Sequence, residues 1–306
     1  MSFKILFMGT PEFSVPILKS IFESNHKVLE VYTQPPKKKN RGQKILNSPI
    51  HEYAKKLKIS VRNPVSLDQK EEIEHIKNLK PDIVIVVAYG KILPSSLLNL
   101  ENILFINIHA SLLPRWRGAA PIQRAIMNMD WETGVSIMKI EPKLDSGPVM
   151  LQSKVKIHPN LNCEELSNEM SKIGSKLILD ALELIKENKA KFITQNESEV
   201  TYAKKIEKTE TKINWDEDAK NIVAKINALN PNPGCWFELD GIRIKIIKAK
   251  EIISKAIPGE ILDDKFTIAC SKNAVQIIEL QKEGKQKMTV DQFLRGNKIK
   301  IGQNLN

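Results

Sequence analysis

Short apolar runs alternate with helical patterns through the first half of the chain. The runs KILFMG and VLEVYT are separated by a stretch, about Ser14 to Ser24, whose apolar residues recur with the helical period. The run DIVIVVA is apolar at nearly every position, which is typical of a strand buried on both faces of a parallel sheet. The alternation predicts an α/β fold: an open, Rossmann-like, mostly parallel sheet of about six or more strands with helices on both faces.

Three helix starts are marked by a capping pair. In such a pair a Ser, Thr or Asn side chain caps the first turn, and a Glu or Gln three residues later returns a hydrogen bond. We expect a helix after each pair, the second one long and amphipathic. The pairs are Ser66 with Gln69, Asn162 with Glu165, and Thr289 with Gln292.

The last third of the chain follows a different pattern. Residues 191–207 are mostly polar without a clear period, so we interpret them as a linker between a domain at 1–190 and a second domain at 208–306. After a helix at about Asp216 to Leu229, short strands predict a smaller C-terminal β-barrel like the oligonucleotide-binding (OB) fold, whose core Trp215 and Trp236 fill. These strands are CWFEL, IRIKIIKA, GEIL, FTIACS and VQIIELQ.

The composition excludes several classes of protein. With 42% hydrophobic and 27% charged residues among 306, the chain is neither disordered nor fibrous. Its 3 cysteines lack a CxxC pair, so neither a disulfide framework nor a structural zinc site is predicted. The longest apolar run is far shorter than a membrane span, and the start MSFKILFMG is typical of a first strand, not of a signal peptide. We expect a cytoplasmic protein.

The net charge of +11 calls for a separate explanation. Five basic residues crowd the segment PPKKKNRGQK, which follows the second predicted strand. Such a run permits phosphate or nucleic-acid binding, but it is equally consistent with a solvated loop. The residues are Lys37, Lys38, Lys39, Arg41 and Lys44.

The loops that follow the strands of a parallel sheet are the places to search for function. The first of them, MGTPEF, contains the single glycine Gly9. The chain has neither the GxGxxG pattern nor the GxxxxGK[ST] pattern. Binding of a dinucleotide or of a nucleoside triphosphate through a P-loop is therefore not predicted.

Asn107 and His109 form a polar pair within an apolar strand, INIHASLLP. Because side chains alternate along a strand, both project from the same face at its end. Burying polar groups costs free energy unless they are hydrogen-bonded. The pair therefore indicates a site, although a core histidine bonded to the backbone remains the alternative for His109.

Asp145 lies in the loop KLDSGPV after another predicted strand. By itself D-S-G is ordinary turn chemistry. Together with Asn107 and His109, however, Asp145 completes a set suited to acyl transfer to an amine. The amide can stabilise an oxyanion, the imidazole can move a proton, and the carboxylate can orient the imidazole.

The segment NIHASLLPRWRGAAPIQ, with LDSG downstream, resembles the folate-dependent formyltransferases, and within them the branch that acts on methionyl-tRNA. The likeness extends over nearly the whole chain. It includes MGTPEF, VVAYGKILP, ETGVSIM, VTYAKKI, INWDEDA and ALNPNPG.

The resemblance implies a reaction and its residues. It implies formyl transfer from 10-formyltetrahydrofolate to the free amino group of methionyl initiator tRNA, producing N-formylmethionyl-tRNA for translation initiation. It further implies a monomer without a metal ion. A pocket aromatic, Trp116 or Tyr89, either stacks on the terminal adenosine or packs structurally. The implied catalytic residues are Asn107, His109 and Asp145, the implied folate-binding residues are Ser111, Leu112, Leu113 and Pro114, and the implied tRNA-binding loop is Gln34 to Pro49 with its five basic residues.

Two rival functions remain open at this point. Formyltransferases acting on glycinamide ribonucleotide or on amino sugars resemble the same catalytic motif, but a small substrate needs no extended cationic surface. A non-catalytic RNA-binding protein would use only the barrel and the basic loop. Against it stands the polar set of Asn107, His109 and Asp145, which would be a standing desolvation cost if unused.

Overall fold

A computed structural model describes residues 2–39 and 44–306. The chain divides into two compact units, and each contains segments from separate parts of the sequence. The first unit comprises Met1–Pro121, Glu132–Lys156 and Ser167–Ala203, and the second comprises Ile122–Trp131, Ile157–Leu166 and Lys204–Asn306.

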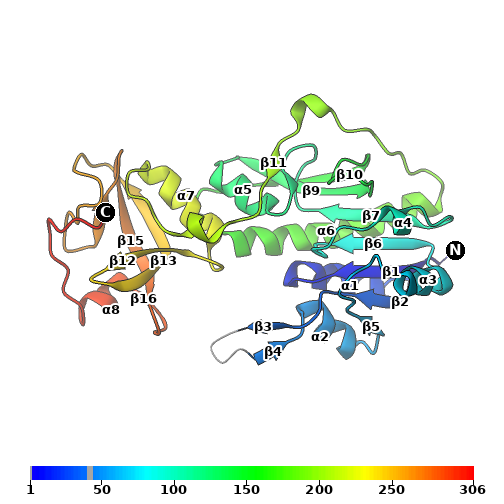
Figure 1. The fold of residues 1–306 in the computed structure, drawn as a ribbon. Coiled ribbons are helices and arrows are strands. Elements are labelled where there is room, and N and C mark those ends of the chain that lie inside the picture. The colour runs from blue at the N-terminus through cyan, green and yellow to red at the C-terminus, as the bar shows by residue number, and fades with distance from the viewer. Residues whose placement is uncertain (1, 40–43) are drawn as a thin grey trace. The chain divides into compact units, whose positions relative to one another are not determined.

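The first unit is built on a seven-stranded sheet with the strand order β10-β9-β7-β6-β1-β2-β5 (Figure 1). The five strands from β7 to β5 are parallel, whereas β9 is antiparallel to both of its neighbours. The predicted mostly parallel sheet is confirmed. Its strands are β1 (Lys4–Gly9), β2 (Lys27–Tyr32), β5 (Val61–Arg62), β6 (Ile83–Val87), β7 (Leu104–His109), β9 (Glu132–Lys139) and β10 (Val149–Lys156).

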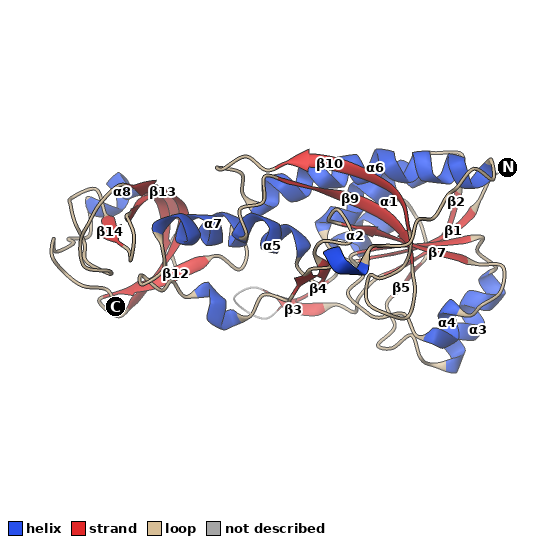
Figure 2. Cartoon of the chain, turned by 90° about the horizontal axis from the view of Figure 1, so that it is seen from above, coloured by secondary structure: helices blue, strands red, loops and turns tan. Residues whose placement is uncertain are grey.

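Helices cover both faces of this sheet, as Figure 2 shows for α6 on one side and α3 and α4 on the other. A Cβ atom at Gly174 of α6 would lie 3.3 Å from Ile17 Cδ1 of α1 and 3.5 Å from Ile108 Cγ2 of β7. Hence α1 and α6 share the face that carries Ile108, while Ile76 of α3 and Leu97 of α4 belong to the opposite core. The helices are α1 (Val15–Phe22), α2 (Pro49–Lys56), α3 (Lys70–Leu79), α4 (Ser95–Leu98) and α6 (Cys163–Lys186).

The capping pairs differ in outcome. Asn162 and Glu165 exchange hydrogen bonds of 3.0 and 2.9 Å at the start of α6, as predicted. Ser66 does not cap a helix, and that prediction was wrong: its hydroxyl accepts from the Asp68 N–H in a local turn, and α3 begins only after Gln69. A side chain that can bond to a backbone amide two residues ahead has an alternative to capping.

The basic segment predicted as a loop contains a short hairpin that projects beyond β2 (Figure 1). Its strands β3 (Lys37–Lys39) and β4 (Lys44–Leu46) pair antiparallel. Lys37 is exposed. Arg41 lies outside the described residues.

The second unit contains a five-stranded antiparallel sheet in which β12, β13, β15 and β14 follow one another and β16 also pairs with β15. The expected segment GEIL forms only isolated bridges instead of a strand. The sheet elements are β12 (Cys235–Leu239), β13 (Ile242–Ile252), β14 (Thr267–Ala269), β15 (Ala274–Lys282) and β16 (Lys287–Thr289), and the helices are α5 (Pro121–Met127), which begins at the last residue of the first unit, α7 (Ala219–Leu229) and α8 (Val290–Leu294).

Aromatic rings pack against one another within a mostly aliphatic core of the second unit. Trp215 packs edge-on against Phe237, which packs edge-on against Phe266. Trp215 is buried, as expected for a core residue. Trp236 differs from the expectation: it is only half-buried, and the Arg243 guanidinium lies 3.8 Å from the centre of its ring.

Residues 191–203 of the predicted linker pack on the first unit. Ile193 forms a bridge with Val149, and β11 (Tyr202–Ala203) pairs in parallel with β8 (Arg117–Gly118). The last boundary between the two units along the chain therefore falls between Ala203 and Lys204. Polar composition alone does not reveal such packing, because the contacts are made largely by backbone groups. The described residues also contain three short 3-10 helices, η1 (Glu12–Ser14), η2 (Glu197–Glu199) and η3 (Lys208–Thr211).

Replacing Thr289 by Ala is expected to destabilise the second unit. The Thr289 hydroxyl accepts from the Gln292 N–H at 3.3 Å, and the Gln292 side chain accepts from the Thr289 N–H at 3.0 Å. Losing such a cap costs about 1 kcal/mol. We expect a lower melting temperature by differential scanning calorimetry for Thr289→Ala and a near wild-type value for Thr289→Ser, which keeps the acceptor oxygen. Equal losses in the two variants would contradict the capping role.

Candidate active site

The candidate site lies at the carboxyl end of β7. Ile106 and Ile108 alternate with Asn107 and His109, so the two polar side chains share the face opposite α6. Asn107 is half-buried, and its carboxamide has no hydrogen-bond partner among the described residues. It is therefore available to a ligand.

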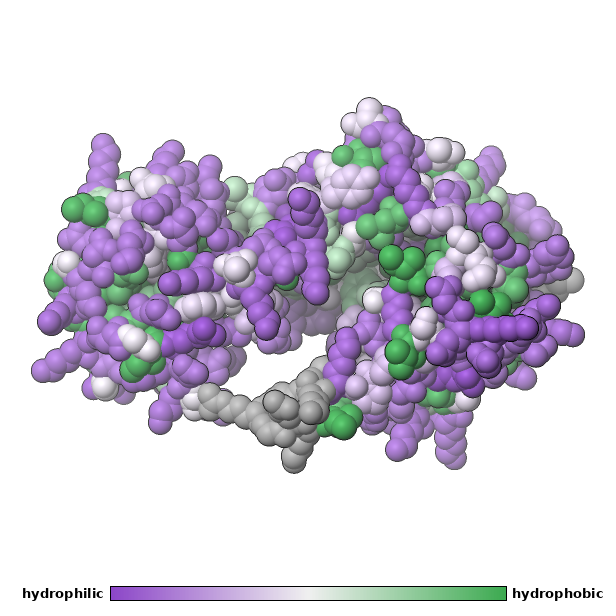
Figure 3. Space-filling view, in the orientation of Figure 1, coloured by the Kyte–Doolittle hydropathy of each residue, from purple (hydrophilic) through white to green (hydrophobic). Residues whose placement is uncertain are grey.

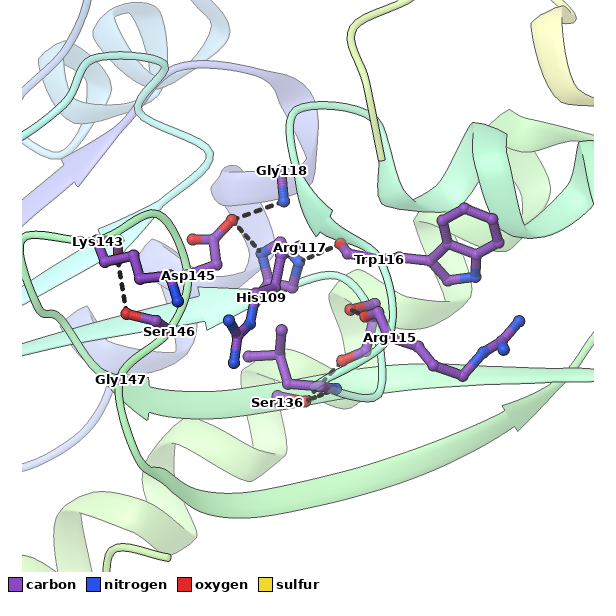
Figure 4. A network of polar contacts seen from close by, with 12 residues as sticks. His109, Arg115, Trp116, Arg117, Gly118, Ser136, Lys143, Asp145, Ser146 and Gly147 are labelled. Atoms are coloured by element: carbon purple, nitrogen blue, oxygen red, sulfur yellow. Dashed lines mark hydrogen bonds and ion pairs between the residues drawn. The ribbon is translucent and has the colours of Figure 1, made fainter. Parts of the chain in front are cut away.

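The imidazole of His109 is buried, and each of its nitrogens faces an oxygen atom, as Figure 4 shows. Nε2 lies 2.9 Å from the carbonyl oxygen of Trp116, and Nδ1 lies 3.7 Å from Asp145 Oδ2. A carbonyl oxygen only accepts hydrogen bonds, so Nε2 carries a proton. The nitrogen that can gain or lose a proton is thus Nδ1, which faces a carboxylate.

The alternative interpretation of His109 is therefore correct in part, since its ring is bonded to a backbone carbonyl. That bond leaves Nδ1 free for chemistry and fixes the orientation of the ring. Orientation by a backbone carbonyl is a common way of setting which nitrogen of a histidine reacts.

Asp145 is held in place by backbone groups. Its Oδ2 accepts from the Gly118 N–H at 2.8 Å, and its own backbone has a φ of 47°, in the left-handed region (Figure 4). Gly147 closes the turn, because a Cβ there would come within 1.9 Å of the Lys139 carbonyl oxygen. The D-S-G segment is thus both a turn and the element that carries the carboxylate to His109.

The loop from Ser111 to Pro114 is tied to β9 and β10 through Ser136. Ser136 Oγ donates to the Ser111 carbonyl at 2.6 Å and accepts from the Leu113 N–H at 3.1 Å. Gln152 Nε2 donates to the Leu113 carbonyl at 2.9 Å. The Ser111 hydroxyl donates to the Arg115 carbonyl, so Ser111 shapes the loop.

Two buried polar residues that the sequence did not single out lie behind the site. The Arg117 side chain is fully buried, and its Nε donates to Gln195 Oε1 at 3.0 Å. Its Nη2 pairs with Glu197 at 2.8 Å, which holds the pKa of that carboxyl below its usual value. Arg117 belongs to the quoted RWRG run, but Gln195 stands in a polar stretch that gave no signal.

Comparison with known proteins places this geometry in a family. Residues 3–182 match the formyl transferase family, and residues 205–298 match the formyl transferase C-terminal domain. The chain belongs to the formyl transferase family. The predicted resemblance is confirmed.

Curated relatives match this formyl transferase over nearly its whole length. A methionyl-tRNA formyltransferase of Pelagibacter ubique (strain HTCC1062) is 48% identical over 301 residues, which cover 98% of this chain and 97% of the relative. A methionyl-tRNA formyltransferase of Parvibaculum lavamentivorans (strain DS-1) is 44% identical over 308 residues, with 99% of each chain covered.

Solved structures share the fold. HypX from Aquifex aeolicus in complex with tetrahydrofolic acid superimposes with a TM-score of 0.68 at 19% identity, covering 99% of this chain and 51% of HypX. The sugar 3N-formyl transferase WlaRD has a TM-score of 0.66 at 20% identity, covering 94% of this chain and 100% of WlaRD. At such identities the likeness concerns the fold alone.

The two candidate aromatic residues of this formyl transferase differ in position. Tyr89 is 1% exposed, and burial raises the pKa of its hydroxyl to about 12. Its ring packs in the core beside β1 and β6. Trp116 is half-buried, and Figure 4 shows its indole pointing away from His109 and Asp145. Tyr89 is thus a packing residue.

The other histidines and the cysteines lie in environments that give no sign of a catalytic role. His75 pairs with the buried Glu30 at 2.7 Å, and His158 is exposed. The three cysteines are buried, and burial raises the pKa of each thiol to about 12. Within residues 2–39 and 44–306, no group of three or more His, Cys, Asp or Glu side chains could hold a metal ion. No described helix is long and apolar enough to cross a membrane.

Proposed function

We propose that this formyl transferase moves the formyl group of 10-formyltetrahydrofolate to the amino group of methionyl initiator tRNA. The observation that carries the proposal is the arrangement at the end of β7. There the Asn107 amide, which has no hydrogen-bond partner in the described part of the chain, lies on the same strand face as the His109 ring. That ring is bonded to Trp116 and faces Asp145. The full-length relatives named methionyl-tRNA formyltransferase support the choice of amine.

The proposed reaction is an acyl transfer in which one C–N bond forms and one breaks. The methionyl amine attacks the formyl carbon, and the carbonyl oxygen becomes an oxyanion that the Asn107 amide stabilises by donating a hydrogen bond. His109 Nδ1 accepts the proton that the amine loses and gives it to the folate nitrogen as the old C–N bond breaks. Asp145 stabilises the positive charge on His109 between these steps.

The folate substrate supplies a formyl group on a nitrogen that can leave. The loop Ser111–Pro114 would bind it, and its structure suits that role. Leu112 and Pro114 are half-buried and apolar, and Ser136 and Gln152 hold the loop backbone rigid. A rigid, partly apolar wall is typical of cofactor pockets.

The second part of the proposal concerns tRNA binding by the basic hairpin. Lys37 is exposed, and most of the surface in view in Figure 3 is hydrophilic. Lysines that contact phosphates release counterions, so the affinity for tRNA falls with rising salt concentration. We also propose that Lys38, Lys39, Arg41 and Lys44 contribute to this binding, and that the enzyme is a cytoplasmic monomer, which light scattering after gel filtration would test.

Replacing Lys37, Lys38 and Lys39 together by Ala is expected to flatten the salt dependence of tRNA affinity. Three lost phosphate contacts lower the slope of log K against log salt by about 2 to 3. Filter binding across a range of salt concentrations measures this slope. A triple alanine variant of Lys55, Lys70 and Lys77, all exposed, removes the same charge elsewhere. An identical slope for the two triple variants would contradict a role of the hairpin.

A direct assay separates the proposed function from its rivals. Purified protein is incubated with 10-formyltetrahydrofolate and one amine at a time: methionyl initiator tRNA, glycinamide ribonucleotide or an amino sugar. We expect formylation of the methionyl-tRNA. Formylation of a small amine alone would assign the protein to another branch of the family. Binding of tRNA without any formylation would favour a non-catalytic RNA-binding protein.

A further inference from the structure

Gln195 is a buried residue that reaches the loop of Asp145 from outside both family matches. The formyl transferase match ends at residue 182, and the match to the C-terminal domain begins at residue 205. Gln195 lies between them and is 7% exposed. Its Nε2 donates to the carbonyl oxygens of Asp145 at 2.8 Å and Gly147 at 2.7 Å, and its Oε1 accepts from Arg117 Nε at 3.0 Å.

These two donated hydrogen bonds bracket the turn that presents the carboxylate. Asp145 has a φ of 47°, a left-handed conformation that is uncommon for a residue other than glycine. Bonds to the carbonyls on both sides of Ser146 hold the turn in this conformation. In it, the Asp145 carboxylate reaches the Gly118 N–H and faces His109 Nδ1. The position of the Asp145 carboxylate thus depends on the Gln195 side-chain amide.

Arg117 determines which way the Gln195 amide points. Its Nε–H can only donate, so the oxygen of the amide must face Arg117 and the NH2 group must face the two carbonyls. Arg117 is itself fixed, because its backbone N–H donates to the Thr201 carbonyl and its Nη2 pairs with Glu197. Both of these acceptors belong to the same connecting segment as Gln195.

The segment also supports the other side of His109. The Trp116 N–H donates to Thr201 Oγ1 at 2.9 Å, and β11 pairs with β8 immediately after it. Gly118 is tightly covered, since a Cβ there would lie 2.8 Å from the Ala203 carbonyl oxygen. The backbone groups that orient His109 and Asp145, the Trp116 carbonyl and the Gly118 N–H, are therefore held by residues 201–203.

We propose that residues 195–203 complete the active site and that Gln195 is the positioning residue for Asp145. Gln195 touches neither substrate in this proposal and acts only by holding the Asp145 turn. The inference rests on the proposed formyl transfer for its kinetic readout. It assigns a role to a segment that lies between the two family matches.

The variant Gln195→Glu tests this role. It has nearly the same size and keeps an acceptor for Arg117, but it loses both donors and turns an oxygen toward two carbonyl oxygens. We expect kcat to fall roughly 10- to 100-fold, because small displacements of catalytic groups have effects of this size. The KM values for the folate and the tRNA should stay within about twofold, since neither substrate loses a contact. A wild-type kcat would overturn the inference.

A double-mutant cycle asks whether Gln195 acts through Asp145. If it does, Asp145→Asn combined with Gln195→Ala should be no slower than Asp145→Asn alone, because the second change removes support from a group that is already disabled. Losses that multiply would overturn the inference. Gln69→Ala is the matched control: it removes the same kind of side chain at an exposed position before α3, outside residues 195–203, so wild-type kinetics are expected.

A second readout does not depend on activity. NMR-detected exchange of the Gly118 amide hydrogen should be at least about tenfold faster in Gln195→Glu than in the wild type, because its acceptor is on the loosened Asp145 turn. Unchanged exchange would overturn the inference. If the wild type formylates no methionyl-tRNA, the proposed function fails, whereas this exchange measurement still decides the role of Gln195.

Discussion

His109→Ala is expected to lower kcat by roughly 10²- to 10⁴-fold, the range for loss of a general acid or base. The ring is the only buried imidazole at the described end of β7, and its Nδ1 faces the Asp145 carboxylate at 3.7 Å. Without it, the amine must lose its proton to water in a site with little solvent access. Steady-state formylation of methionyl initiator tRNA at saturating 10-formyltetrahydrofolate measures the effect.

The control for this variant is His158→Ala. His158 is exposed, and only its backbone carbonyl forms a described hydrogen bond, so its loss should leave kcat unchanged. His109→Ala should also keep its fold, because shrinking a side chain at the end of a strand leaves the sheet bonds intact. Turnover close to wild type in His109→Ala would remove the residue from the mechanism and would favour the purely structural reading of its bond to Trp116.

The central strand β6 was predictable because burial acts on every one of its residues. All five residues of β6 are buried, as the continuous run DIVIVVA indicates. The antiparallel strand β16 was not expected, since only three residues, Lys287–Thr289, pair there and two of them are exposed. Short edge strands depend on a neighbour for their hydrogen bonds, and a local pattern carries no information about that neighbour.

The candidate site was predictable only where its functional groups are side chains that stand out in a regular sequence pattern. Alternation along β7 placed Asn107 and His109 on one face. Asp145 was grouped with them because it lies in a loop that follows a predicted strand, where functional residues of such sheets gather. The Trp116 carbonyl and the Gly118 N–H could not be inferred, because every residue has these groups. Gln195 lies 50 residues from Asp145 in the chain, so only the folded structure brings its amide to that turn.

This division also explains why the predicted linker differs from the observed segment. Polar residues such as Gln195 and Thr201 were interpreted as part of a linker, but both use their polar atoms to bind backbone groups of the site. Composition does not distinguish a polar side chain in water from one that satisfies a buried partner. Only the hydrogen bonds of the folded chain show which of these two environments a polar side chain has.

Asn107→Ala is expected to lower kcat roughly 10²- to 10³-fold, the usual effect of removing one oxyanion donor. The Asn107 carboxamide has no hydrogen-bond partner among the described residues, so its NH2 group is available to the substrate oxygen. An interaction made chiefly in the transition state changes kcat and leaves KM nearly constant, which distinguishes it from substrate binding. Single-turnover formylation with excess enzyme isolates this chemical step.

Asn107→Asp sharpens the test, because it preserves size while replacing the donor by a carboxylate that repels an oxyanion. Its loss should equal or exceed that of Asn107→Ala. If Asn107 only filled space, the near-isosteric variant would be the less harmful of the two. Asn99→Ala, at an exposed position after α4, controls for the loss of a carboxamide elsewhere in the first unit and should react at the wild-type rate. A single-turnover rate within about threefold of wild type in both Asn107 variants would contradict the oxyanion role.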